Sequence, residues 1–324
     1  MAEAYNLKNG ETLTCRIVDD SDDSDAARIV SHLGHKGGHW QRHFDEWLDS
    51  NIKRLNTRFY IGTIGDEIAG NIMVVSFRGL GLMGHVYTSP DHRRKGVCDV
   101  LMDFHMDDFR DRNGTALFLN TGFESPPYRI YERHGYLPVP GRPGSMWWSP
   151  KHTEIDKLWA GLYSDPGESV SSLSWQHWPS MNAFFHLPVE QIVRNVTYGR
   201  YGISEAEWPF LAVKNDVTED RTVQARVIET GDGHMSGLAT LAPERRWGAL
   251  NTTSVFDLFV HPDAADMVPK LIEDFDWPDN HVLAYAAGSD ELTIDLLSEA
   301  DFHPHSHIER FFEDDTGLVV MDRD

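Results

Sequence analysis

The stretch "HVYTSPDHRRKGVCDVLMDFHMDDF", His85 to Phe109, indicates how the first half of this chain folds. It begins with alternating apolar residues, which are typical of a β-strand, and continues through a turn that contains a proline. Three basic residues and a glycine, Arg93 to Gly96, follow, and an amphipathic pattern predicts a helix over residues 91–112. A helix that starts directly after a strand and a turn presents unpaired backbone N–H groups and the positive end of its dipole, so the stretch predicts an anion site.

The charge of the whole chain makes this basic triplet conspicuous. The 324 residues include 29 Lys and Arg but 51 Asp and Glu, which gives a formal charge of −22 at pH 7. So acidic a protein repels nucleic acid and anionic lipid, and we expect neither as a partner. Cationic side chains at Arg93, Arg94 and Lys95 would hold a polyphosphate against this background, and Gly96 would let a phosphate approach the backbone closely.

The same sequence predicts a soluble, cytoplasmic protein. No apolar run approaches the roughly 20 residues of a membrane span, and the N-terminus "MAEAYNLKNGETLTCRIVDD" lacks the basic start and apolar run of a signal peptide. Cys15 and Cys98 cannot build a disulfide framework and fit no zinc module, so we expect reduced thiols.

The length of the chain favours two domains. Residues 13–148 alternate as strand, two helices, three antiparallel-type strands, helix, strand, helix and strands, which predicts a mixed α/β fold. The pattern begins again after Pro150, so we expect domains over residues 1–150 and 151–324. The later stretch "FDLFVHPDAADMVPKLIEDF", residues 256–275, echoes the opening one but carries Ala265–Val268, without a glycine, in place of the basic loop. An internal duplication with a degenerate second copy is the natural hypothesis.

Two motifs resemble those of the GCN5-related N-acetyltransferase (GNAT) family. The loop Pro90-Asp91-His92-Arg93-Arg94-Lys95-Gly96-Val97-Cys98 is similar to the family's signature of Arg or Gln, two residues, Gly, one residue, and Gly or Ala, with Cys98 in the last position. The segment "IYERHGY", Ile130 to Tyr136, is similar to a second family motif. The resemblance covers residues 13–148 and implies two tandem GNAT-like domains, each a mixed, mostly antiparallel sheet flanked by helices.

The resemblance also implies a cofactor, acetyl-CoA or another acyl-CoA, bound through its pyrophosphate. The expected cofactor-binding positions carried over from the signature are Arg93, Arg94, Lys95, Gly96, Val97 and Cys98. The first domain would then be catalytic, and the degenerate second one structural or shaping the acceptor site.

Transfer of an acyl group from a thioester to an amine needs an acid for the departing thiolate and a base for the amine proton. By the resemblance, Tyr131 stands at the family's acid position. Many family members place a glutamate five residues before the proline of the loop, and the same count back from Pro90 reaches His85. Histidine titrates near neutral pH and could serve as the base.

The segment "SHLGHKGGHWQRHFDEW", residues 31–47, is dense in histidine and tryptophan. We expect His39, Trp40 and His43 to line a pocket for the acceptor, and the surrounding carboxylates suit a cationic amine. His39 and His43 lie one helical turn apart, but no further metal-binding pattern accompanies them, so no metal is predicted.

The leading hypothesis is therefore an acyl-CoA-dependent N-acyltransferase for a small-molecule amine. One alternative is a GNAT-fold acyl-CoA decarboxylase, in which His85 and Thr88 would serve a proton transfer and CO2 would be released without any amine. Another is a non-catalytic acyl-CoA sensor, which would bind the cofactor without releasing its thiol. The sequence does not identify the acceptor, the acyl chain or the oligomeric state.

Overall fold

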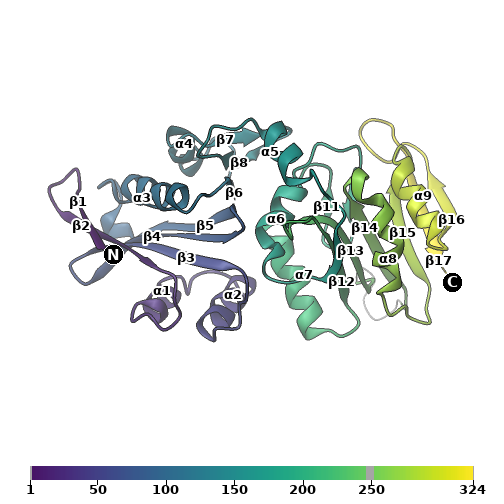
Figure 1. Ribbon diagram of the computed structural model, residues 1–324, viewed down its shortest axis with the longest axis horizontal. Helices are drawn as coiled ribbons and strands as arrows, with labels where there is room; N and C mark the ends of the chain where they lie inside the picture. The colour runs from purple at the N-terminus through teal and green to yellow at the C-terminus, as the bar shows by residue number, and fades with distance from the viewer. Residues whose placement is uncertain (1, 246–251, 324) are drawn as a thin grey trace. The chain divides into compact units, whose positions relative to one another are not determined.

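The computed structural model describes residues 2–245 and 252–323, which fall into two compact units. The first unit comprises the chain up to Glu154 together with Trp178–Asn182. The second comprises Ile155–His177 and the chain from Ala183 onward. Each unit has a mixed, mostly antiparallel sheet with helices against it (Figure 1), so the predicted fold class is confirmed. The roles assigned to residues 1–150 and 151–324 stay predictions.

The first unit builds its sheet from eight strands. They are β1 (Ala2–Asn6), β2 (Thr12–Val18), β3 (Asn56–Ile64), β4 (Glu67–Phe77), β5 (Leu80–Thr88), β6 (Ala116–Asn120), β7 (Leu137–Val139) and β8 (Arg142–Trp148). Its helices are α1 (Ala26–His32), α2 (Gly38–Leu48), α3 (Val97–Asp111) and α4 (Pro126–Arg133). Helix α3 covers one face of the sheet, whereas α1 and α2 lie on the other (Figure 1).

The strand order of this sheet is β1-β2-β3-β4-β5-β6-β8-β7, and only β5 and β6 run parallel. Their pairing is short, joining Leu80–Leu82 to Ala116–Phe118. Strand β5 also carries a bulge, because Asn71 on β4 pairs with Tyr87 while Met73 pairs with Gly84. One extra residue is thus inserted into β5, and a bulge of this kind redirects the side chains that follow it.

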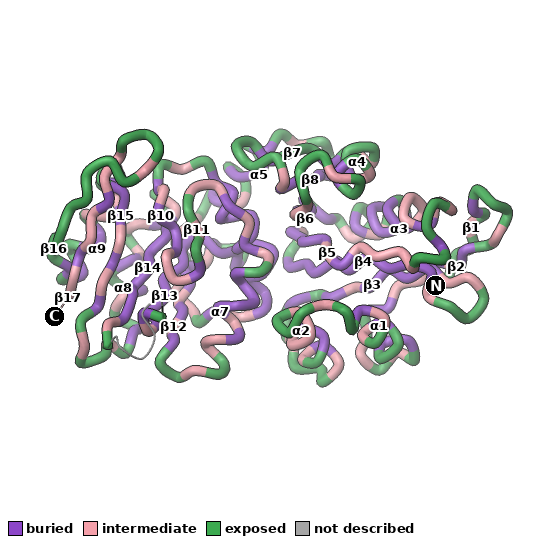
Figure 2. Tube along the Cα trace, turned by 180° about the vertical axis from the view of Figure 1, so that it is seen from behind, coloured by how far each residue is buried: buried purple, intermediate pink, exposed green. Residues whose placement is uncertain are grey.

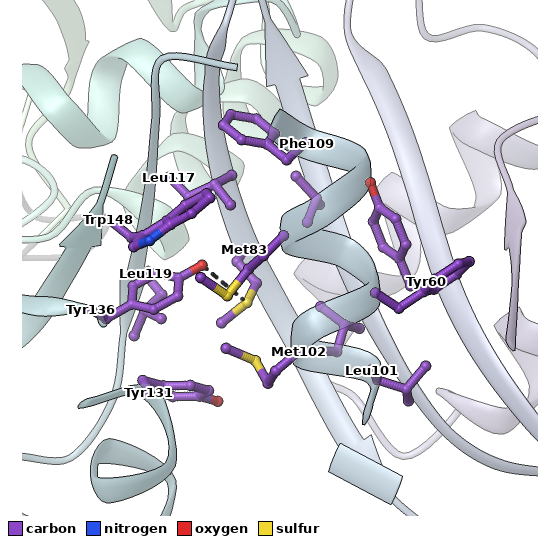
Figure 3. Close-up of a cluster of buried hydrophobic side chains, with 14 of the residues drawn as sticks. Tyr60, Met83, Leu101, Met102, Phe109, Leu117, Leu119, Tyr131, Tyr136 and Trp148 are labelled. Carbon is purple, nitrogen blue, oxygen red and sulfur yellow. Dashed lines mark hydrogen bonds between the residues drawn. The ribbon is translucent and has the colours of Figure 1, made fainter. Parts of the chain in front are cut away.

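Helix α3 anchors the core of the first unit. Val97, Leu101, His105 and Phe109 follow one another at four-residue intervals and are all buried, which places them on one helix face. Val97, Leu101 and Phe109 join a hydrophobic cluster that includes Tyr131 and the other side chains labelled in Figure 3. In Figure 2 the strands under this helix are largely buried.

The predicted start of this helix is wrong by several residues. Pro90–His92 form a short 3-10 turn, and α3 begins only at Val97. Arg94 and Gly96, with φ of 63° and 95°, are left-handed and interrupt the helical run.

The chain from Ile155 onward contains the second sheet. Its strands, with a separate two-stranded pair, are β9 (Ser169–Ser172), β10 (Val193–Asn195), β11 (Arg200–Tyr201), β12 (Gln224–Glu229), β13 (Met235–Pro243), β14 (Ser254–Val260), β15 (Val282–Ala287), β16 (His303–Ile308) and β17 (Leu318–Arg323). Its helices are α5 (Ile155–Leu162), α6 (His177–Phe184), α7 (Glu207–Glu219), α8 (Val268–Glu273) and α9 (Glu291–Glu299).

The second sheet has the order β9-β12-β13-β14-β15-β17-β16, with only β14 and β15 parallel. This order follows that of β2 to β7 in the first sheet strand for strand. The shared order agrees with the hypothesis of an internal duplication, which stays a prediction. Within the described residues, the helices are all too short or too polar to cross a bilayer.

Candidate functional site

A cavity of about 590 Å³ lies in the first unit where β5 ends and α3 begins. It is lined by Lys8, Val86, Tyr87, Thr88, His92, Arg93, Arg94, Gly96, Val97, Cys98, Asp99, Pro126, Pro127, Ile130, Tyr131 and Arg133. The structure thus places five of the six predicted cofactor-binding residues and the predicted acid around one space.

The loop before α3 has an unusual backbone. Arg94 and Gly96 are both left-handed, and Gly96 is the residue that immediately precedes the helix. A left-handed arginine is uncommon, and backbone strain of this kind concentrates at functional sites. Turns that combine left-handed residues with a helix start aim successive N–H groups into one concavity, which binds anions.

The hydrogen bonds of the loop leave most of these amides available. The N–H of Arg93 donates to the carbonyl of Pro90, at an N–O distance of 3.3 Å. Within the described residues, no acceptor faces the backbone N–H groups from Arg94 to Asp99. From Arg94 onward the loop therefore leaves its amides available, whereas the amide of Arg93 is already engaged. The assignment of these residues to a cofactor stays a prediction.

The three basic side chains of the loop point in different directions. Arg93 and Arg94 line the cavity, and Arg93 Nε also donates to the carbonyl of Thr88 at 3.1 Å. Lys95 does not line it, because its Nζ lies 2.8 Å from a carboxylate oxygen of Glu11. Of the triplet, only two side chains are thus placed to meet a ligand in this cavity.

Two further cations, which the sequence analysis did not identify, line the same space. Lys8 lies in the turn between β1 and β2, and Arg133 is the last residue of α4. The pair Asn9-Gly10 between two alternating segments is a hairpin signal that could have revealed the turn of Lys8.

Tyr131 is held on the cavity wall by α4. The start of this helix is capped: Ser125 Oγ accepts a hydrogen bond from the N–H of Tyr128 at 3.3 Å, and Pro126 occupies the first turn. The side chain of Tyr131 is 6% exposed, and its ring centroid lies 6.1 Å from that of Tyr136 (Figure 3). Tyr131 lines the cavity, whereas Tyr136 does not.

Cys98 also lines the cavity, at the position where the signature has a smaller residue. Burial raises the pKa of its thiol to about 11. The thiol is accordingly protonated at neutral pH, and it is not the thiolate that an acyl-cysteine intermediate would require.

His85, the predicted base, does not line this cavity. It is the bulged residue of β5, with a φ of 50°, and its ring packs against Trp40 and Phe44 of α2 at centroid distances of 4.5 and 5.0 Å. The next residue, Val86, packs on the α3 side and lines the cavity. The structure therefore separates His85 from Tyr131 by one strand and groups it with the predicted acceptor residues.

Burial keeps the imidazole rings of His85 and His43 in the neutral form. Desolvation lowers the pKa of His85 well below its ordinary value and that of His43 to about 3. Both rings are neutral at pH 7. His43 and Trp40 both contact Trp178, which belongs to the segment of α6 counted with the first unit. His39, the third predicted acceptor residue, is exposed.

Among the residues that the structure describes, no three His, Cys, Asp or Glu side chains are arranged to hold a metal ion.

The sequence between β3 and β7 matches a known family. Residues 56–138 match the family model described as an acetyltransferase (GNAT) domain. A search of the curated proteins found no match. This match confirms the predicted GNAT acetyltransferase domain over residues 56–138.

Solved structures similar to this chain carry related descriptions. One is a ribosomal-protein-alanine N-acetyltransferase from Brucella melitensis, at 16% identity and a TM-score of 0.39, with 48% of this chain and 99% of that chain covered. Another is a phosphinothricin acetyltransferase from Sinorhizobium meliloti in complex with AcCoA, at 15% identity and a TM-score of 0.38, with 48% and 86% covered. At these values the structural likeness assigns no substrate.

Proposed function

We propose, from the premise that this chain contains an acetyltransferase domain of the GNAT family, that it transfers the acyl group of acetyl-CoA directly to a small-molecule amine. The observation that carries the proposal is the cavity beside α3. It combines a run of available backbone amides at a helix start with a tyrosine hydroxyl from α4.

The amides from Arg94 to Asp99 would bind the pyrophosphate of the cofactor. Helix α3 directs the positive end of its dipole at this point, and backbone N–H groups give charge-assisted hydrogen bonds to phosphate oxygens. Arg93 and Arg94 add positive charge to the same wall. Such a site compensates locally for the acidic surface of the protein.

Tyr131 is the proposed acid. The amine nitrogen attacks the thioester carbonyl carbon, a C–N bond forms, the C–S bond breaks, and the thiolate of CoA takes the phenolic proton. Direct transfer fits the protonated state of Cys98, since that thiol is not activated as an intermediate acceptor.

His85 stays the proposed base, acting from the side of the strand opposite to the cavity. Its ring is neutral but, because burial lowers its pKa, it is a weak base, so it would take the proton from the acidic N–H of the adduct formed after attack. Because Trp40 packs against this ring, we propose that the amine approaches from the α2 side, along His39 and Trp40, whereas His43 is fully buried. Strand β5 is paired to β6 only as far as Leu82, so within the described residues neither His85 nor Val86 has a ladder partner on that edge.

The test is release of free CoA thiol with acetyl-CoA and a panel of small amines. Tyr131→Phe is expected to lower kcat by about 10²-fold, with the affinity for acetyl-CoA nearly unchanged, because a positioned acid contributes roughly that factor. Tyr136→Phe is the matched control, since it removes a buried tyrosine hydroxyl that lies outside the cavity. Equal turnover by Tyr131→Phe and the wild type would remove Tyr131 from the mechanism.

The products separate the alternatives. Release of CO2 from a carboxylated acyl-CoA without an amine would replace this proposal by the decarboxylase. Tight binding of acetyl-CoA without thiol release for any amine would favour the sensor.

A further inference from the structure

The charges around the cavity contrast with those of the protein. Lys8, Arg93, Arg94 and Arg133 line it against a single carboxylate, that of Asp99. In a chain with a formal charge of −22, this local excess of cations is a feature of the site and not of the composition. In the proposed function, the loop amides and the side chains of Arg93 and Arg94 bind the pyrophosphate of the cofactor. Lys8 and Arg133 are not needed to bind the pyrophosphate.

These two remaining cations converge on one point. Lys8 Nζ lies 3.5 Å from Oδ2 of Asp99, and an Nη atom of Arg133 lies 3.2 Å from Oδ1 of the same carboxylate. They come from elements that are distant in the sequence, a hairpin turn and the end of a helix. Two cationic groups that reach the two oxygens of one carboxylate can also reach two oxygens of one phosphate.

The turn that carries Lys8 is fastened to the cofactor loop. The N–H of Lys8 donates to the carbonyl of Lys95 at 3.2 Å, and the ion pair between Lys95 and Glu11 ties the other end of the same turn to the loop. The aliphatic part of Lys8 passes over Gly96, since a Cβ on that glycine would lie 3.6 Å from it. Lys8 is therefore held beside the loop by its own backbone, although its amino group is exposed.

We propose that Lys8 and Arg133 form a second phosphate subsite, separate from the loop amides, that takes the 3′-phosphate of CoA. The inference rests on the proposed function, because it assigns a further part of the same cofactor. A phosphomonoester carries nearly two negative charges at neutral pH, more than the one charge of Asp99. The two cations exchange the Asp99 carboxylate for the phosphate when the cofactor binds.

Calorimetric titration with acetyl-CoA and with acetyl-dephospho-CoA tests the subsite, since the second ligand keeps the pyrophosphate and lacks only the 3′-phosphate. We expect the wild type at low salt to bind the dephospho ligand about 10-fold more weakly, and a variant with Lys8→Met and Arg133→Met to reduce that ratio to about twofold, because each exposed cation contributes a few-fold. Methionine keeps the stem of each side chain.

Arg129→Met is the control. Arg129 lies on the same helix as Arg133, pairs with Glu124 and Glu132 and does not line the cavity, so the ratio should stay at the wild-type value. Thermal unfolding of each variant confirms that it is folded before the titration, and Lys8→Met alone serves as the milder variant.

Equal affinity of the wild type for the two ligands would overturn the subsite and leave the proposed function intact. The subsite would also be overturned if the double variant lost affinity for both ligands by the same factor, since Lys8 and Arg133 would then bind the pyrophosphate. Failure of the wild type to bind either ligand would instead overturn the proposed function.

Discussion

The loops after β5 and after β14 occupy equivalent positions in the two sheets, yet they start their helices in different ways. After β5, a single 3-10 turn is followed by left-handed Arg94 and Gly96, and the amides at the helix start have no described acceptor. After β14, a 3-10 run from Pro262 to Met267 leads straight into α8 without a left-handed residue. The side chain of His261 also accepts from the N–H of Asp263, at 3.2 Å.

The strands that lead into these loops differ as well. Strand β5 is bulged against β4, whereas β14 pairs with β13 in an unbroken register from Ser254 to Val260. Asp257 on β14 is used structurally, because its carboxylate accepts from the N–H groups of Val196 and Thr197 at 2.6 and 3.1 Å. A shared strand order therefore does not fix the geometry of the loop that follows the strand. The bulge and the two left-handed residues distinguish the sheet that has the cavity.

The largest effect should follow from Gly96→Glu. Its left-handed φ strains any side chain there, and the added carboxylate would face the phosphate, so we expect the Kd for acetyl-CoA to rise by about 10²-fold or more as several charge-assisted hydrogen bonds are lost. Equilibrium dialysis with labelled acetyl-CoA measures it. Gly65→Glu, at another left-handed glycine in the β3–β4 turn, with a φ of 58°, introduces the same side chain outside the cavity and should bind normally. Similar losses in both variants would contradict a site at the loop.

Asp257→Asn should damage the second unit alone. The amide can accept from only one of the two N–H groups and turns a donor toward the other, which costs about 1–3 kcal/mol of unfolding free energy for an unsatisfied buried group. Urea denaturation measures the loss, with exposed Asp279→Asn as the control. The affinity for acetyl-CoA should not change, and a weakened affinity would show that the second unit contributes to the cofactor site.

Acid should destabilise the first unit through its buried histidines. The pKa of His43 falls from its ordinary 6.5 to about 3 on burial, so folding favours the neutral ring. The unfolding free energy is therefore highest well above pH 6.5, and it falls as the pH drops below 6.5, by about 1.4 kcal/mol at pH 5.5. Urea denaturation at pH 7.5 and 5.5 should show a smaller difference for His43→Leu than for the wild type. His39→Leu, at an exposed position, should keep the wild-type difference in unfolding free energy between the two pH values. A smaller difference in this variant would show that burial of His43 is not the cause.

The smallest effect concerns the caps of the two equivalent helices. Ser125 caps α4, and Asp290 caps α9 by accepting from the N–H of Thr293 at 3.1 Å. Replacement of either by alanine should cost about 1 kcal/mol of unfolding free energy. Only Ser125→Ala should also raise the KM for acetyl-CoA, because α4 carries Tyr131 and Arg133. Equal increases in KM for Ser125→Ala and Asp290→Ala would show that α4 has no role in cofactor binding that α9 lacks.

Much of the first unit could be predicted from the sequence because its periodicity is strong. The order of helices and strands over residues 13–148 was expected from alternation and helical spacing. The start of α3 was not, since left-handed Arg94 interrupts an otherwise continuous amphipathic pattern.

The site was predictable in part. The loop motif identified the residues beside the cavity, but the side chain of Lys95 is drawn away by Glu11, whose proximity depends on a hairpin that was not expected. The face of the sheet on which His85 lies depends on the bulge in β5. Side chains along a strand alternate between the two faces, and one inserted residue moves the side chains that follow it to the opposite face.

Hydrogen–deuterium exchange with and without saturating acetyl-CoA would show whether the amides of the loop before α3 bind the cofactor. The amides from Arg94 to Asp99 should exchange fast in the free protein and slow by about 10-fold or more when phosphate oxygens accept from them, while residues 263–268 should not respond. Absence of protection in the loop after β5, or equal protection in the loop after β14, would contradict a phosphate site formed by the amides from Arg94 to Asp99.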